Sequence, residues 1–118
     1  MLNLAHKQLK VYAMSIELVK NVYLLTQAFP GDEQFILASQ LKRAAISVCS
    51  NIAEGSSRSS RMEKKRFYEI SRASLVEIDT QIEIGLRLGY LQKDRISDLE
   101  NQLESVFKML SKMIQNLK

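Results

Sequence analysis

The stretch ASQLKRAAISVCSNIAEGSSRSSRMEKKR, residues 38–66, contains the pattern that decides the fold. Its first half repeats apolar residues at spacings of three and four, which indicates one buried face of an α-helix. That face comprises Ala38, Leu41, Ala45, Val48 and Ile52. Its small residues allow a neighbouring helix to approach closely. We predict a helix over residues 33–54, with Asp32 as its N-cap and Gly55 as the left-handed residue that ends it.

The second half of the stretch predicts the turn into a further helix. Ser60 is followed three residues later by Glu63, which is the spacing of a capping box. The apolar pattern then predicts a helix over residues 61–88, and Gly89 is expected to end it. Its inward face is predicted to comprise Phe67, Ile70, Ser74, Ile78, Gln81 or Ile82, Gly85 and Leu88.

Two further helical patterns flank this pair. Residues 6–28 carry two adjacent apolar stripes, one of Leu9, Tyr12, Ile16, Val19 and Tyr23 and one of Val11, Met14, Leu18, Val22 and Leu25. Two stripes indicate either a wide core face or burial against a second molecule. Residues 93–117 carry a heptad seam of Ile96, Leu99, Leu103, Val106, Leu110, Met113 and Leu117. The short connections predict an all-α, antiparallel up-down four-helix bundle that forms one domain, residues 1–118.

The composition excludes several classes of protein. Apolar residues make up 46% and charged residues 25% of the chain, which is ordinary for a folded globular domain. No apolar run approaches the roughly 20 residues that span a bilayer. The N-terminus does not resemble a signal peptide, and the single Cys49 cannot form an intramolecular disulfide. We therefore expect a cytoplasmic protein that does not associate with membranes.

Positive charge is concentrated around the turn between the two central helices. The whole chain has 17 basic and 13 acidic residues, a net charge of +4. Residues 56–72 alone have the same net charge, because they include six basic residues and two glutamates. The basic residues are Arg58, Arg61, Lys64, Lys65, Arg66 and Arg72. A helix start adds partial positive charge and free N–H groups, so we predict that this cluster binds RNA or DNA. The alternative is a solvated charged face without a ligand.

The sequence contains no recognisable catalytic group. The di-iron sites of four-helix bundles need Glu-x-x-His pairs, but His6 is the single histidine and has no glutamate three residues before it. Cys49 lies on the small-residue face without a histidine near it in the sequence, so we expect a packed thiol rather than a nucleophile. No glycine-rich phosphate loop is present. We therefore expect neither a metal site nor a cofactor, and no enzymatic activity.

Five polar residues in the two central helices form a second candidate cluster of unknown role. They are Gln40, Asn51, Glu54, Glu77 and Gln81. They could converge on a small polar site, but we favour a structural hydrogen-bond network or a solvated face. An enzyme that uses Glu54 and Glu77 is the least favoured interpretation, because two helical carboxylates without a nucleophile or a histidine define no reaction.

Several short motifs resemble those of a known family. The segments QLKRAA (residues 40–45), NIAEG (51–55) and LGYL (88–91) are similar to the four-helix-bundle proteins encoded in intervening sequences of bacterial 23S ribosomal RNA genes. The resemblance covers about residues 9–91. Departures are Tyr12, where tryptophan is common, and Ser71 and Ala73, where alanine and glycine are common.

The resemblance implies a cytoplasmic protein that assembles into a homopentameric ring. It also implies kinship with the accessory variability determinant of diversity-generating retroelements, a basic pentamer that binds nucleic acid and a reverse transcriptase. Our leading hypothesis is therefore a non-enzymatic oligomeric bundle that binds nucleic acid through the basic cluster. The alternative is a scaffold that docks a partner protein and has no direct role with nucleic acid.

Overall fold

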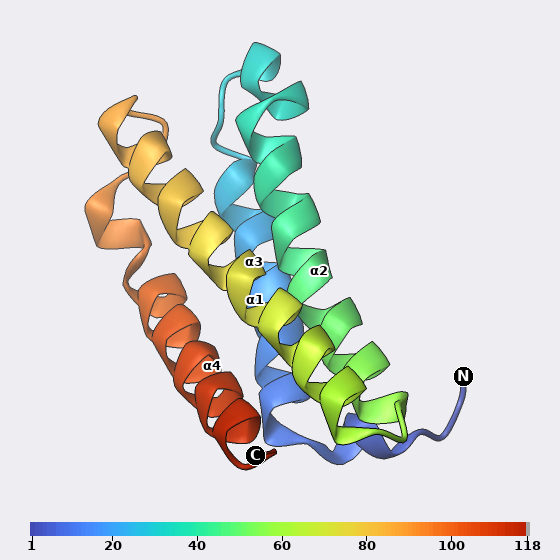
Figure 1. Cartoon of the computed structure of the whole chain (residues 1–118). Coiled ribbons are helices and arrows are strands. Elements are labelled where there is room, and N and C mark those ends of the chain that lie inside the picture. The colour runs from blue at the N-terminus through green and yellow to red at the C-terminus, as the bar shows by residue number, and fades with distance from the viewer. Residues whose placement is uncertain (118) are drawn as a thin grey trace.

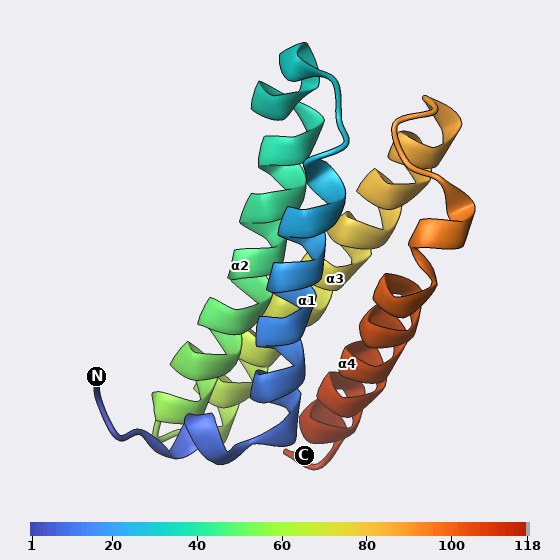
Figure 2. The ribbon, with the colours of Figure 1, turned by 180° about the vertical axis from the view of Figure 1, so that it is seen from behind.

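The computed structural model describes residues 1–117 and contains four long helices, α1 (Lys10–Thr26), α2 (Leu37–Ser57), α3 (Arg61–Arg87) and α4 (Ser97–Gln115). Short 3-10 turns precede α1 (Ala5–Gln8), α2 (Gly31–Phe35) and α4 (Lys93–Arg95). The chain reverses direction at each connection, so α1 and α3 run one way and α2 and α4 the other (Figures 1 and 2). No strand occurs within residues 1–117. The prediction of an all-α four-helix bundle is confirmed.

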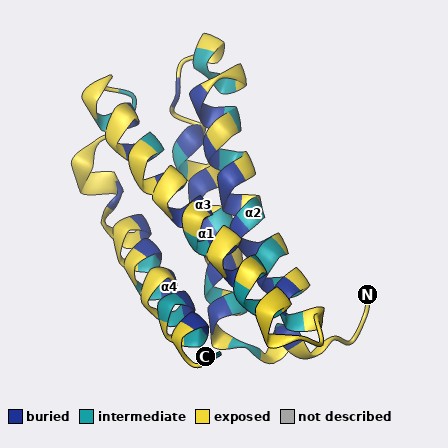
Figure 3. Cartoon of the chain, in the orientation of Figure 1, coloured by how far each residue is buried: buried dark blue, intermediate teal, exposed yellow. Residues whose placement is uncertain are grey.

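Each helix packs against two others. Helices α2 and α3 form the most extensive pair, α1 packs against α2 and α4, and α4 also packs against α3. Buried positions lie on the inner faces of the helices and exposed positions on the outside (Figure 3). All five residues predicted for the inner face of α2 are buried, which confirms that prediction. No helix in the described part of the chain is long and apolar enough to cross a membrane.

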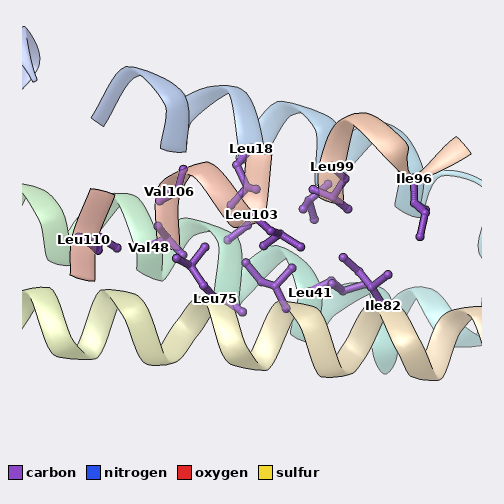
Figure 4. Close-up of a cluster of buried hydrophobic side chains, with 14 of the residues drawn as sticks. Leu18, Leu41, Val48, Leu75, Ile82, Ile96, Leu99, Leu103, Val106 and Leu110 are labelled. Carbon is purple, nitrogen blue, oxygen red and sulfur yellow. The ribbon is translucent and has the colours of Figure 1, made fainter. Parts of the chain in front are cut away.

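The core is a single cluster of aliphatic side chains from all four helices (Figure 4). Leu18 of α1, Val48 of α2, Leu75 of α3 and Leu110 of α4 are all almost completely buried. The seam of α4 follows the prediction as far as Leu110, but its next buried residue is Ile114 rather than Met113. A straight helix repeats every 3.6 residues and therefore drifts away from a strict heptad.

Two other predicted faces are only partly correct. On α1, the stripe that includes Leu18 faces the core, whereas Ile16 and Tyr23 of the other stripe are exposed. Of the residues predicted for the third helix, Ile70 of α3 and Leu88 just after it are exposed. The predicted Ser74, Ile78, Ile82 and Gly85 are buried, and the buried face of α3 also includes Tyr68, Ser71 and Leu75. Small serines replace large apolar residues there because α2 lies very close.

The connection between α1 and α2 differs from the prediction. Asp32 lies in a 3-10 turn and is not an N-cap, since α2 begins only at Leu37 and has no side-chain cap. Gln34 organises the connection, because its Nε2 donates to the carbonyl oxygens of Thr26 and Phe29 at 2.8 and 3.1 Å. Together with the hydrogen bond from the Phe29 amide to the Thr26 carbonyl, these contacts fix the turn that follows α1.

Gly55 does not end α2, so its predicted role is wrong. The helix continues to Ser57, and Gly55 is buried against α3. A Cβ atom at this position would lie 2.7 Å from Cε1 of Tyr68. Lys64 caps the helix instead, since its Nζ donates to the carbonyl oxygens of Gly55 and Ser56 at 3.4 and 3.1 Å. Close packing, rather than a left-handed backbone, explains the glycine.

Both predicted ends of α3 are confirmed to within one residue. At the start, Ser60 Oγ accepts a hydrogen bond from the amide of Glu63 at 3.1 Å. At the end, Gly89 has a φ of 80°, its amide donates to the carbonyl of Leu86, and the amide of Tyr90 donates to the carbonyl of Gly85. This pair of hydrogen bonds is a Schellman motif, which ends the helix.

The LGYL motif joins two connections at the same end of the bundle. The Tyr90 hydroxyl donates to Glu33 Oε1 at 3.1 Å, and the Tyr90 ring lies 5.6 Å from the Phe29 ring between centroids. Leu91 packs against Gly85, where an added Cβ would lie 3.1 Å from the leucine Cδ1. The motif therefore fixes the turn after α3 against the connection between α1 and α2.

Replacing Gly89 with alanine is expected to lower the free energy of unfolding by about 1 kcal/mol, because an L-residue is strained at positive φ. Nothing lies within 4 Å of an added Cβ, so the backbone is the sole cause of the loss. Gly31→Ala is the matched control, since Gly31 is equally open and has no positive φ. Urea denaturation of both variants checks the prediction, and an equal effect at the two glycines would contradict it.

Candidate nucleic-acid interface

The predicted basic cluster lies where α2 connects to α3, at the end of the bundle opposite the LGYL motif (Figure 1). Arg58 belongs to the connection, and the other five residues lie in the first half of α3. Contacts to α2 and to α4 divide these side chains into groups. The cluster therefore extends around the start of α3 rather than along one face of it.

Two members of the cluster are held against the protein. Lys64 caps α2, as described above. Arg72 reaches α4, where its Nη1 donates to Ser111 Oγ at 3.2 Å and its guanidinium lies 5.8 Å from the centroid of the Phe107 ring. Both residues are half-buried, and their side chains are anchored to neighbouring helices. They therefore contribute to the positive electrostatic potential of this end, rather than acting as mobile side chains that contact a ligand.

Arg58 and Arg66 share one aromatic ring. Their guanidinium carbons lie 4.9 and 5.6 Å from the centroid of Phe67, which is half-buried. Arg58 Nη2 also forms an ion pair with Glu54 Oε2 at 3.1 Å. Both partners are well exposed, so water screens this pair and it contributes little to stability. Sequence reasoning identified the arginines but not the ring that orders them.

Arg61, Lys65 and Arg66 have no acidic partner within residues 1–117. Arg61 and Arg66 are exposed and Lys65 is half-buried. Arg61 is also the first residue of α3, where unpaired backbone amides and the helix dipole add positive potential. These three side chains are the part of the cluster best placed to meet phosphate groups.

The structure does not bring the second candidate cluster together. Gln40 and Glu77 are exposed, Glu54 pairs with Arg58, and Asn51 Nδ2 donates to the carbonyl and hydroxyl oxygens of Ser47 on its own helix. Gln81 has a buried Oε1 without a hydrogen-bond partner among the described residues. Within residues 1–117 no hydrogen bond or ion pair joins two members of this set.

A serine network that sequence reasoning missed joins α2 to α3. Ser74 Oγ donates to Ser47 Oγ at 2.9 Å, and Ser71 Oγ donates to the carbonyl oxygen of Val48 at 2.8 Å. Asn51 joins the network through its 3.0 Å hydrogen bond to Ser47 Oγ. The facing small residues of the two helices were the available signal. These hydrogen bonds satisfy polar groups inside a close helix contact.

Cys49 is buried at the inner side of α2. Burial raises the pKa of its thiol, although a hydrogen bond with Ser15 acts in the opposite direction. The thiol is therefore protonated at neutral pH, as the prediction of a packed core cysteine requires. In the part of the chain that the structure describes, no three His, Cys, Asp or Glu residues lie close enough together to hold a metal ion.

A groove of about 400 Å³ runs between α3 and α4. It is lined by the apolar residues Leu75, Val76, Leu103 and Phe107 and by the charged residues Asp79, Glu100, Glu104 and Lys108. A 2.7 Å hydrogen bond from Lys108 lowers the pKa of the Glu104 carboxyl. The groove is thus apolar and bordered mainly by carboxylates, in contrast to the basic end of the bundle.

The fold and this surface define the class of protein as a small four-helix bundle with a cationic end. The chain belongs to the 23S rRNA-intervening sequence protein family, whose model matches residues 7–112. This confirms the resemblance seen in the NIAEG and LGYL motifs.

A solved structure shares the fold. It is the crystal structure of a protein of unknown function from the S23 ribosomal protein family of Bacteroides thetaiotaomicron. The two chains are 23% identical and superpose with a TM-score of 0.80 over 89% of this chain and 95% of the other. Among curated proteins none matches this chain.

Proposed function

We propose that this protein is a non-enzymatic, self-associating four-helix bundle of the cytoplasm that binds RNA or DNA through the start of α3. The observation that carries the proposal is the group of Arg61, Lys65 and Arg66, which lacks acidic partners within residues 1–117. Arg58, Lys64 and Arg72 surround this group and add to its potential. When such a group approaches the phosphates of a nucleic acid, counterions are released, and this release makes the free energy of binding favourable.

The exposed apolar residues support self-association. On α1, Tyr23 and Leu24 are 41% and 64% exposed, and Val76 of α3 and Leu88 just after α3 are both 55% exposed. Contiguous exposed apolar surface marks interaction sites, and Tyr23 and Leu24 are consecutive on α1. A ring of five copies, as the family resemblance implies, would repeat the basic end of each bundle and increase the affinity for a long nucleic acid through multivalency.

The test of this proposal is the salt dependence of nucleic-acid binding. Fluorescence anisotropy with a labelled 20-nucleotide RNA is measured at several salt concentrations, while light scattering reports the size of the assembly. The logarithm of the affinity should fall with the logarithm of the salt concentration by about 0.7 to 0.9 per phosphate contact, or roughly 2 to 3 for three contacts. The proposal would be ruled out if the protein did not bind the RNA, or if its affinity did not change with salt concentration.

The groove between α3 and α4 favours a second candidate function, a scaffold that docks a partner protein. Its apolar and carboxylate lining is better suited to a protein surface than to phosphates. Affinity purification after nuclease treatment distinguishes the two functions. Recovery of one specific protein, combined with no binding to the labelled RNA, would support the scaffold.

A further inference from the structure

We infer that the surface around Phe67 stacks against unpaired bases, so that the nucleic acid bound is single-stranded or contains an unpaired loop. This inference rests on the proposed function and adds the class of nucleic acid to it. It depends on the placement of two arginines over one partly exposed ring. Electrostatic binding of phosphates alone would not need this contact.

The geometry places two guanidinium groups over one aromatic ring inside the basic cluster. The guanidinium carbons of Arg58 and Arg66 lie 4.9 and 5.6 Å from the centroid of the Phe67 ring. The two arginines come from different parts of the chain, one from the turn after α2 and the other from α3. Arg58 also lies within ion-pair distance of Glu54. Arginines that stack on a ring keep their planar groups ordered, and bases stack on both guanidinium planes and aromatic rings.

The neighbouring aromatic residue cannot serve this role. Tyr68 is 5% exposed, lies against Gly55, and has its hydroxyl 3.0 Å from Ser56 Oγ. Phe67 is therefore the aromatic ring of the cluster that reaches solvent. Arg61 and Phe67 both lie within the first two turns of α3. A strand whose phosphates meet Arg61 can therefore reach the Phe67 ring with its bases.

Stacking selects single strands for a physical reason. In a duplex the base faces are covered by their neighbours, so a protein surface meets phosphates and base edges alone. A purely electrostatic surface binds a duplex at least as well as a single strand, because the duplex has the higher charge density and the steeper counterion term. A preference for single strands must therefore come from contacts to the bases.

The experiment compares a single strand without internal pairing and a duplex with the same number of phosphates, each as RNA and as DNA. The wild-type protein should bind the single strand at least about fivefold more tightly than the duplex, which is the lower end of one stacking contact. Phe67→Leu should lower the affinity for the single strand about five- to tenfold and the affinity for the duplex less than about twofold. Comparison of the RNA and DNA arms then shows which of the two is preferred.

Phe107→Leu is the matched control. Phe107 also lies below an arginine, since the Arg72 guanidinium is 5.8 Å from its ring, but it belongs to α4 and to the groove. This variant should change neither affinity. Thermal unfolding of both variants shows whether either fails to fold.

Arg66→Lys keeps the charge at an exposed position and removes the planar group, so it tests the inference without a folding risk. It should reduce the preference for the single strand while the salt dependence of binding stays unchanged. Equal losses for single strand and duplex in Phe67→Leu, or an unchanged preference in Arg66→Lys, would overturn the inference but leave the proposed function intact. Absence of binding to every nucleic acid by the wild-type protein would instead overturn both.

Discussion

Reversing Arg61, Lys65 and Arg66 to glutamate is expected to weaken nucleic-acid binding roughly 100-fold at about 0.15 M salt. Each phosphate contact contributes a salt-dependent factor of about four to six at that concentration, and three are removed together. The slope of the logarithmic salt dependence should fall by roughly 2 to 3. Fluorescence anisotropy of the variant and the wild-type protein, over the same salt series, measures both quantities.

The fold should survive this charge reversal. Lys64 and Arg72 remain in place, so the cap of α2 and the contact to α4 are preserved. Glutamate at position 61 lies in the first turn of α3, where a negative charge interacts favourably with the helix dipole. A loss of affinity with an unchanged circular dichroism spectrum therefore reports on binding rather than on unfolding.

A second triple variant separates position from total charge. Reversal of Lys20, Lys93 and Lys112 also changes the net charge by −6, from +4 to −2, but at exposed positions outside the cluster. It should cost much less affinity than reversal within the cluster. If both triple variants lose the same affinity, binding follows the overall charge and the start of α3 is not the interface.

Exchanging Gly55 for valine is expected to lower the free energy of unfolding by about 3 kcal/mol, the upper end of overpacking penalties. An added Cβ would lie 2.7 Å from Cε1 and 2.9 Å from Cδ1 of Tyr68, and 3.1 Å from Cβ of Phe67. The Tyr68 ring cannot move away easily, because it is buried and its hydroxyl is hydrogen-bonded to Ser56. Valine has a higher helix propensity than glycine, which offsets well under about 1 kcal/mol of this loss in the free energy of unfolding.

The control for this prediction is Gly31→Val. Nothing lies within 4 Å of an added Cβ at Gly31, so the substitution should change the stability by no more than about 0.5 kcal/mol. Urea denaturation at equilibrium gives both values. If Gly55→Val were as stable as the wild type, the close contact between α2 and α3 would not be what requires glycine at this position.

The same glycine shows where sequence reasoning was insufficient for the fold. A glycine after a helical pattern is a good signal for a helix end, and at Gly89 the prediction is correct because the backbone there is left-handed. At Gly55 the helix continues, since the side chain of Lys64 satisfies the last carbonyl groups and Tyr68 needs the space. Both causes lie in α3, and no pattern within α2 contains them.

The candidate site shows a similar division. The position of the basic cluster at the turn between α2 and α3 could be predicted, because charge is counted directly along the chain. The different environments of its members could not be predicted, since they depend on partners such as Gly55, Phe67 and Ser111. The five residues of the second candidate cluster, which includes Gln40 and Glu77, do not lie together. Their shared polarity could be seen in the sequence, but it does not imply contact.

Helix type, approximate length and the buried faces of α2 and most of α4 follow from local spacing, because each residue's position on a helix depends on its own neighbours in the chain. The serine network, the role of Gly55 and the contact of Arg58 with Phe67 follow from the tertiary packing, because each needs an atom from a different element at a particular distance. The basic cluster was therefore visible in the amino-acid order, whereas its division into anchored residues, freely exposed residues and a stacking surface arose only when α2, α3 and α4 came together.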